Sequence, residues 1–387
     1  MIRHEPYRLL FPLGLFCALI GLGVWIPSYF WPQLFPYPGQ GHAIIQIQGF
    51  LFSFILGFLC TMLPKVLGVP TLGALTLALF IIGLAGTTVA ALFGEYGLSQ
   101  MFHLFLLLNF GTFILIRFPK RRNNPPAFFV FIALAMLADL KGTTLRLLIL
   151  AGWWDVIPSR TEILLQYQAF PLLLIMGVGG FLLPKLFGNA VIDPKSLSSQ
   201  SNSSIRFLLL LGLTFLLSYG VQYWGVHALS TRIGYGIRAV VWLWFLSCSL
   251  RVQHVPSKFP AYLTGGRVAP YFIAMGLVLP VFFPTYTLAW EHLIFITGFL
   301  WLTLSIATRV VTAHGGRLDL LDRNRRQTLA YGILIVLATA ARVSTDIWPG
   351  AHALHLALAS TFVISALVIW TRIHIPLIFV TPSDKAL

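Results

Sequence analysis

The chain has 387 residues, of which 58% are hydrophobic and 10% are charged, and its mean hydropathy is +0.85. A water-soluble domain cannot bury that much apolar surface, so the composition excludes soluble proteins and indicates a polytopic membrane protein in contact with a lipid bilayer. The formal net charge of +15 is explained by Lys and Arg at the ends of apolar spans, and we predict no nucleic-acid partner.

Windows of about 20 residues predict twelve transmembrane helices, and hence an all-α protein. In chain order the predicted spans are 8–30, 43–64, 71–93, 97–117, 127–152, 163–185, 206–224, 232–251, 268–285, 288–311, 328–346 and 352–375. With the N-terminus inside, most Lys and Arg residues fall in the inner segments, and the outer loops hold only Arg160 and Arg232. This asymmetry predicts that both termini are cytoplasmic.

An internal repeat organises the spans. The run from Gln46 to Gly68, QIQGFLFSFILGFLCTMLPKVLG, recurs from Gln166 to Gly188 as QYQAFPLLLIMGVGGFLLPKLFG, and a weaker copy runs from Glu291 to Gly316. The copies fall on the second, sixth and tenth spans. They predict one transmembrane domain built of three parallel four-helix pseudo-repeats, at about 1–122, 123–258 and 259–387.

This pseudo-threefold plan is similar, as a fold-level analogy, to the catalytic subunit of haem-copper oxidases. The sequence has no histidine between His103 and His227. The sixth and seventh spans therefore lack the imidazoles that an oxidase-type copper centre needs. We predict neither oxygen reduction nor proton pumping, and nothing in the sequence establishes enzymatic turnover.

Histidines are the candidate metal ligands, because neutral imidazole binds haem iron and copper. They gather toward the outer ends of the spans, at His42, His103, His227, His292, His352 and His355. His42 and His292 lie on repeat-equivalent helices that could hold a macrocycle between them. His352 and His355 are three residues apart and share one helical face. The alternative is that each imidazole is an interfacial residue with its polar tip among the headgroups.

Charged and amide side chains inside the spans are a second set of candidates. A charge near the midplane costs at least about 2.5 kcal/mol, so each should face the bundle interior with a partner. Asp139 could pair with Lys141 or with an arginine of another helix, whereas Arg238, Arg309 or Arg342 could bind haem propionates. For the repeated amides we predict interhelical hydrogen bonds; these are Gln46, Gln48, Gln166 and Gln168.

Several blocks resemble the NnrS family, membrane proteins linked to bacterial nitric-oxide stress and described as carrying haem and copper. HAIIQIQGF…GFLCTMLP, from His42 to Pro64, resembles the family's HAHEMxFGF…GFLLTAVP, and MGVGGFLLPKLF, from Met176 to Phe187, resembles its GGRxxP segment. The block from His292 to Arg317 is similar to H…MTRxxLGHTGR. The opening Pro6-Tyr7-Arg8 and Arg342 also match.

The resemblance implies haem b and copper as cofactors, nitric oxide or a nitrosylated metal species as ligand, and the bacterial inner membrane as location. Its matching motif residues are His42, His292, Arg309, His314, Arg317 and Arg342. Combined with the histidine pattern, it gives as candidate cofactor-binding residues His42, His103, His292, Arg309, Arg342, His352 and His355. Among these the candidate metal ligands are His42, His292, His352 and His355.

The sequence also departs from the family pattern. Ile44 and Ile45 stand where the pattern has a second His and a Glu, and Phe181 stands where it has Arg. Two alternatives therefore stay open beside a haem protein. One is a twelve-helix transporter or channel for a small anion, lined by the buried arginines and Asp139. The other is a degenerate relative that no longer binds metal.

Overall fold

The structure, a computed structural model, describes residues 5–35, 37–153, 160–187, 202–224, 228–250 and 260–380. Across these ranges it contains helices and no strand, and twelve helices are long and apolar enough to cross a membrane. Each predicted span overlaps one of these helices, so the predicted all-α membrane architecture is confirmed. His227 and most of the polar segment at 193–204 lie outside the described residues.

Several spans consist of more than one helical segment. The first four spans contain α1 (Tyr7–Gly23) with α2 (Trp25–Phe30); α3 (Gly39–Ile44), η1 (Ile45–Leu51) and α4 (Phe52–Leu67); α5 (Ala74–Leu92); and α6 (Tyr96–Arg117). The next four contain α7 (Val130–Leu150); α8 (Thr161–Leu164), η4 (Leu165–Ala169), α9 (Phe170–Leu174), η5 (Ile175–Gly179) and α10 (Gly180–Leu186); α12 (Asn202–Trp224); and α13 (Ala228–Trp244) with η6 (Phe245–Leu250).

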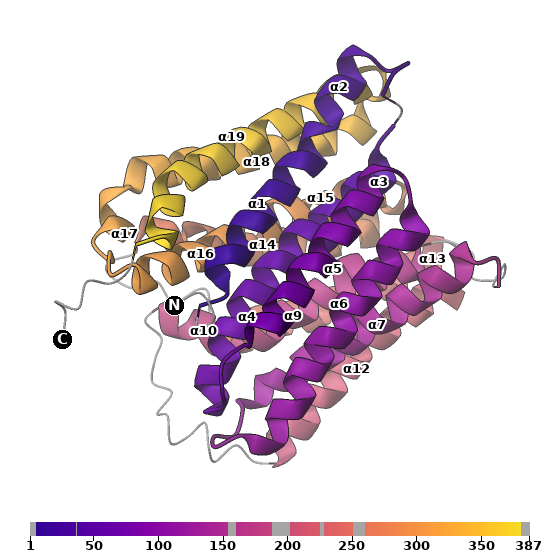
Figure 1. The fold of residues 1–387 in the computed structure, drawn as a ribbon. Helices are drawn as coiled ribbons and strands as arrows, with labels where there is room; N and C mark the ends of the chain where they lie inside the picture. Colours follow the sequence, from indigo (N-terminus) through magenta and orange to yellow (C-terminus); the bar gives the residue numbers. More distant parts are fainter. Residues whose placement is uncertain are drawn as a thin grey trace.

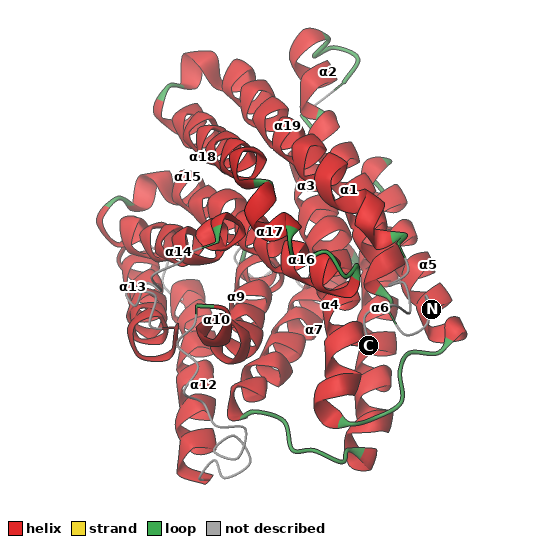
Figure 2. Cartoon of the chain, turned by 90° about the vertical axis from the view of Figure 1, so that its left-hand side faces the viewer, coloured by secondary structure: helices red, strands yellow, loops and turns green. Residues whose placement is uncertain are grey.

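The last four spans follow the same plan. They contain α14 (Thr264–Phe282); α15 (Thr287–His292), η9 (Leu293–Leu300) and α16 (Trp301–His314); α18 (Arg325–Ile347); and α19 (His352–Ile378). The short helix α17 (Leu320–Arg323) connects α16 to α18. Figure 1 shows α18 and α19 side by side, with α1 next to them, and Figure 2 views the helical bundle from its left-hand side.

The first and last spans meet at one end of the bundle. The Arg8 guanidinium donates hydrogen bonds to the backbone carbonyls of Ile378 and of Val380, the latter at 3.1 Å. The chain therefore begins its first span and ends its last span at the same end of the bundle, which agrees with an even number of membrane crossings. Large apolar side chains such as Leu217, Val240 and Ile333 are exposed on the outside of the helices, as contact with a lipid bilayer requires. The cytoplasmic location of the termini stays a prediction.

Glycines allow close helix crossings inside the first two predicted repeat units. A Cβ atom on Gly57 would lie 2.9 Å from the Phe11 ring, and one on Gly177 would lie 2.8 Å from Ile132. In both units the second span thus packs tightly on the first, as small residues permit in membranes. The threefold repeat itself stays a prediction.

Four of the described spans contain π-helical turns, which the sequence did not predict; in the eighth span this is η6. The other three are the spans that carry the repeated motif, and their π segments are η1, η4 with η5, and η9. A π-helical turn inserts an extra residue per turn and frequently marks a functional site. Here η1, η4 and η9 each contribute side chains to the wall of one large cavity.

Candidate functional site

A cavity of about 560 Å³ lies between spans from all three predicted repeat units. Its wall includes three of the candidate cofactor-binding residues, His42, His292 and Arg342. Most of the other wall residues are apolar, and they come from α1, α2, α3, η1, α8, η4, α15, η9 and α19, with Tyr37 from the segment before α3. The volume falls within the range of about 300–1,000 Å³ that is usual for ligand and cofactor sites.

The two cavity histidines have the same hydrogen-bonding arrangement, which leaves the Nε2 atom of each ring without a hydrogen bond to any residue that the structure describes. The Nδ1 atom of His42 lies 2.6 Å from the backbone oxygen of Gly21, and the Nδ1 atom of His292 lies 2.7 Å from that of Leu288. A carbonyl oxygen only accepts hydrogen bonds, so in each ring the proton is on Nδ1. The Nε2 atom then keeps its lone pair, which is the arrangement of a histidine ready to bind a metal.

Aromatic contacts fix the plane of each imidazole. The Trp25 ring lies edge-on to His42, with centroids 5.3 Å apart, and the Phe295 ring lies edge-on to His292 at 5.5 Å. Trp25 and Phe295 are themselves wall residues of the cavity. Both imidazoles are therefore held in place by one backbone hydrogen bond and one ring contact.

Three arginines also line the cavity, and each is paired with a carboxylate. The pairs are Arg146 with Glu162 at 3.1 Å, Arg160 with Glu291 at 2.8 Å, and Arg342 with Asp346 at 3.3 Å. Two of these pairs join different spans, because Arg146 lies in α7 and Glu162 in α8, and Arg160 precedes α8 while Glu291 lies in α15. The ion pairs therefore help to hold the cavity wall together.

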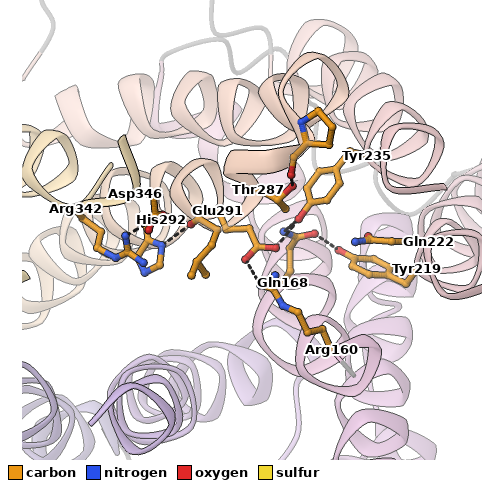
Figure 3. Close-up of polar contacts among 12 residues, drawn as sticks. Arg160, Gln168, Tyr219, Gln222, Tyr235, Thr287, Glu291, His292, Arg342 and Asp346 are labelled. Carbon is orange, nitrogen blue, oxygen red and sulfur yellow. Dashed lines mark hydrogen bonds and ion pairs between the residues drawn. The ribbon is translucent and has the colours of Figure 1, made fainter. Parts of the chain in front are cut away.

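Glu291 is the centre of a buried polar network that the sequence did not predict (Figure 3). Its carboxylate is 2% exposed and accepts hydrogen bonds from Tyr235, at 2.6 Å, and from Arg160. The Glu291 charge raises the pKa of the Arg160 guanidinium. Arg160 has a φ of 104°, the one positive value at a non-glycine residue in the described chain. Such backbone strain is typical of functional sites.

Arg160 was identified from the sequence only as an outer-loop charge. The sequence feature that could have indicated its ion pair is the small number of acidic residues, since the chain has 11 Asp and Glu in total. Glu162 and Glu291 stand at the starts of apolar spans, where a buried carboxylate needs a cationic partner. The two glutamates therefore indicate that ion pairs exist, but the sequence does not show that Arg160 is the partner of Glu291.

The other predicted metal ligands, His352 and His355, do not line the cavity. The His352 ring is 6.4 Å from the ring of Tyr37, which is a wall residue, but His352 is not itself one. The Nδ1 atom of His355 lies 2.9 Å from the Ser344 hydroxyl. The structure thus brings His42 and His292 together and leaves this second pair outside.

His103 is buried away from the cavity and contacts Asp139. Its Nε2 atom lies 3.1 Å from both carboxylate oxygens, and the Thr143 hydroxyl donates to the same carboxylate. The predicted pairing of Asp139 with Lys141 or an arginine is therefore wrong. Lys141 points to the exposed face of α7 because residues two apart on a helix do not share a face.

The repeated glutamines form interhelical hydrogen bonds, as predicted. Gln48 and Gln100 exchange hydrogen bonds at 3.3 and 2.9 Å, and Gln166 donates to Gln100 at 2.8 Å. Gln168 accepts a hydrogen bond from Arg238 at 2.8 Å. Arg238 was one of the arginines considered as a partner for a haem propionate. Its hydrogen bond to Gln168 instead joins the eighth span to the sixth. Gln46 donates to the backbone oxygen of Ala18 in α1 at 3.0 Å, and it also lies in the cavity wall.

The remaining motif residues lie at the opposite ends of the spans. His314 lies 3.1 Å from Glu5 and 3.3 Å from Lys65, and the exposed Arg317 pairs with Asp319 at 3.0 Å. Arg317 lowers the pKa of the Asp319 carboxyl. Arg309 lies in α16, one turn before this group, and is not a wall residue of the cavity. These residues form a separate polar region.

In the part of the chain that the structure describes, no three His, Cys, Asp or Glu side chains come close enough to hold a metal ion by themselves. The cavity therefore offers two imidazoles as its metal-binding donors. No curated protein matches the chain. The family described as NnrS protein matches residues 1–381, which is nearly the whole sequence. The chain therefore belongs to the NnrS family.

Proposed function

We propose that the cavity lined by His42 and His292 holds a haem, and that the protein acts in the bacterial response to nitric oxide. The observation that carries the proposal is the convergence of two imidazoles from different spans, each with Nδ1 on a backbone carbonyl and Nε2 available. This is the protonation state and orientation that a haem-iron ligand needs. The family membership supports the connection with nitric oxide.

The residues present fit a haem in three respects. The cavity volume of about 560 Å³ suits a cofactor. Its wall is largely apolar, as the macrocycle requires. Arg146, Arg160 and Arg342 supply guanidinium groups, which bind carboxylates such as propionates with good geometry. When bound, the haem supplies an iron atom that binds nitric oxide.

The chain's own residues would position the cofactor and exclude water. Trp25 and Phe295 hold the imidazole planes, and the apolar side chains of η1 and η9 surround the site. Arg342 is a wall residue, is 7% exposed and would hold a haem propionate. Because Arg342 also contacts Asp346, a propionate there would add to an existing charged network.

Copper is not part of this proposal. Copper sites in proteins commonly use three or more donors, and the described residues show no such group. A haem needs only one or two axial ligands from the protein. The donor set at His42 and His292 therefore favours haem over a copper ion in this cavity.

The geometry gives less support to the two alternatives. An anion path needs polar groups along its length, but most of the wall residues of this cavity are apolar. A degenerate relative has no need of two oriented imidazoles facing one cavity. The replacements at Ile44 and Ile45 leave both imidazoles in place.

The proposed location is the bacterial inner membrane, with both termini cytoplasmic. The twelve membrane-spanning helices and the positions of Lys and Arg along the sequence support it. In that orientation the haem cavity lies near the periplasmic side, and the region around His314 lies near the cytoplasm.

The proposal is tested by the absorption spectrum and iron content of purified variants. We expect a Soret band in the wild type and its loss or shift in His42→Ala and in His292→Ala. His355→Ala is the matched control, because its ring contacts Ser344 outside the cavity wall. Equal loss in the His355 variant, or a wild type without iron, would refute the proposal.

A further inference from the structure

A second, smaller cavity adjoins the His42–His292 cavity. Its volume is about 90 Å³, and it shares Leu51 and Phe299 with the larger one as wall residues. Its other wall residues come from α4, from α9 and η5, and from α16. All of them lie further along the second, sixth and tenth spans than the walls of the larger cavity. The small cavity therefore extends the large one deeper into the bundle.

The walls of the small cavity are almost entirely apolar. They consist of Leu, Ile, Val, Phe, Pro and Gly, with Thr303 as the single polar residue among the described wall residues. A buried water molecule needs two to four polar partners, and apolar cavities without them stay dry. Transfer of an ion or a polar solute into such a site is strongly unfavourable. The walls thus select small neutral molecules.

The volume narrows the choice further. Sites for cofactors and drug-sized ligands have volumes of about 300–1,000 Å³, far above the 90 Å³ found here. Dry apolar cavities of about 150 Å³ take up benzene or xenon. The small cavity is therefore suited to a xenon atom or to a few diatomic molecules, and it is too small for a ring-shaped cofactor.

We propose that the cavity between α4, η5 and α16 takes up neutral diatomic gas molecules and passes them to the His42–His292 cavity. Leu51 and Phe299 stand between the two spaces, so rotation of these side chains opens the passage. The passage into a haem site rests on the proposed function. The uptake of gas by the small cavity does not.

Xenon tests the uptake without any need for haem. Leu174→Phe adds volume inside the small cavity, because Leu174 is a wall residue there and not in the large cavity. Leu217→Phe is the matched control, since Leu217 is 68% exposed on the outside of α12. In xenon-pressurised crystals we expect xenon between α4, η5 and α16 in the wild type and in Leu217→Phe. In Leu174→Phe we expect its loss.

Two crystallographic results would overturn the proposal. One is the absence of xenon from the wild-type cavity, and the other is density for a lipid acyl chain in its place. Both results can be obtained whether or not the purified protein contains iron. A protein that takes up xenon but lacks haem would refute the proposed function and leave gas uptake standing.

Rebinding of carbon monoxide after flash photolysis tests the passage in the haem-loaded protein. We expect Leu174→Phe to slow rebinding by about fivefold, which corresponds to about 1 kcal/mol of added barrier. Leu217→Phe should rebind at the wild-type rate, and all three proteins should share one absorption spectrum. An unchanged rate in Leu174→Phe, despite the loss of xenon, would refute the passage while leaving the haem site intact.

Discussion

The ion pair between Arg160 and Glu291 should contribute measurably to the stability of the folded protein. Glu291 is 2% exposed, and its carboxylate lies 2.8 Å from the guanidinium. Two unit charges about 4 Å apart attract by about 4 kcal/mol at an effective dielectric constant of about 20. Arg160 is 45% exposed, so solvent screens part of that attraction. We therefore expect a coupling energy of about 1–2 kcal/mol.

A double-mutant cycle measures this coupling directly. The variants are Arg160→Ala, Glu291→Gln and the double mutant, and the quantity is the free energy of unfolding in a defined detergent. Glu291→Gln keeps an oxygen that accepts from Tyr235, so it isolates the charge. Arg160→Ala should be the more damaging change, because it leaves a buried carboxylate without its counter-charge. Additive effects within about 0.5 kcal/mol would refute the reasoning.

Two further substitutions test the packing of the bundle. Asp139→Ala should lower the free energy of unfolding by about 1–3 kcal/mol, because it leaves the buried His103 ring unpaired. Asp139→Asn should lower it by less. Equal losses for the two variants in chemical unfolding would contradict the His103–Asp139 contact. Gly276→Ala should destabilise by about 1–3 kcal/mol, because its Cβ would lie 2.7 Å from the backbone oxygen of Trp290. Gly236→Ala is the control, because a Cβ at Gly236 would meet open space. If the two variants shift the thermal unfolding temperature equally, the close packing at Gly276 is contradicted.

The topology could be predicted from the sequence because a bilayer demands long apolar runs and excludes unpaired backbone. The twelve spans and the family follow from that pattern and from the motifs around His42 and His292. Span ends were less predictable. The ninth helical span begins at Ala261 and not near residue 268, because a polar first turn lowers hydropathy without ending the helix.

The candidate site was predictable only in part. The histidine pattern and the repeat together led to His42 and His292, which do line one cavity, but also to His352 and His355, which do not. Helical periodicity places those two on a common face without saying which neighbour that face contacts. The Arg160–Glu291 pair depends on the positive φ of Arg160, which no local pattern encodes.

The most direct test of the haem site is a density map of the purified protein, recorded by electron cryo-microscopy without added cofactor. We predict a planar macrocycle in the cavity between η1 and η9, with iron at bonding distance from the Nε2 atom of His42, of His292 or of both. A map that shows this cavity free of any macrocycle, or iron bound instead at His352 and His355, would contradict the account.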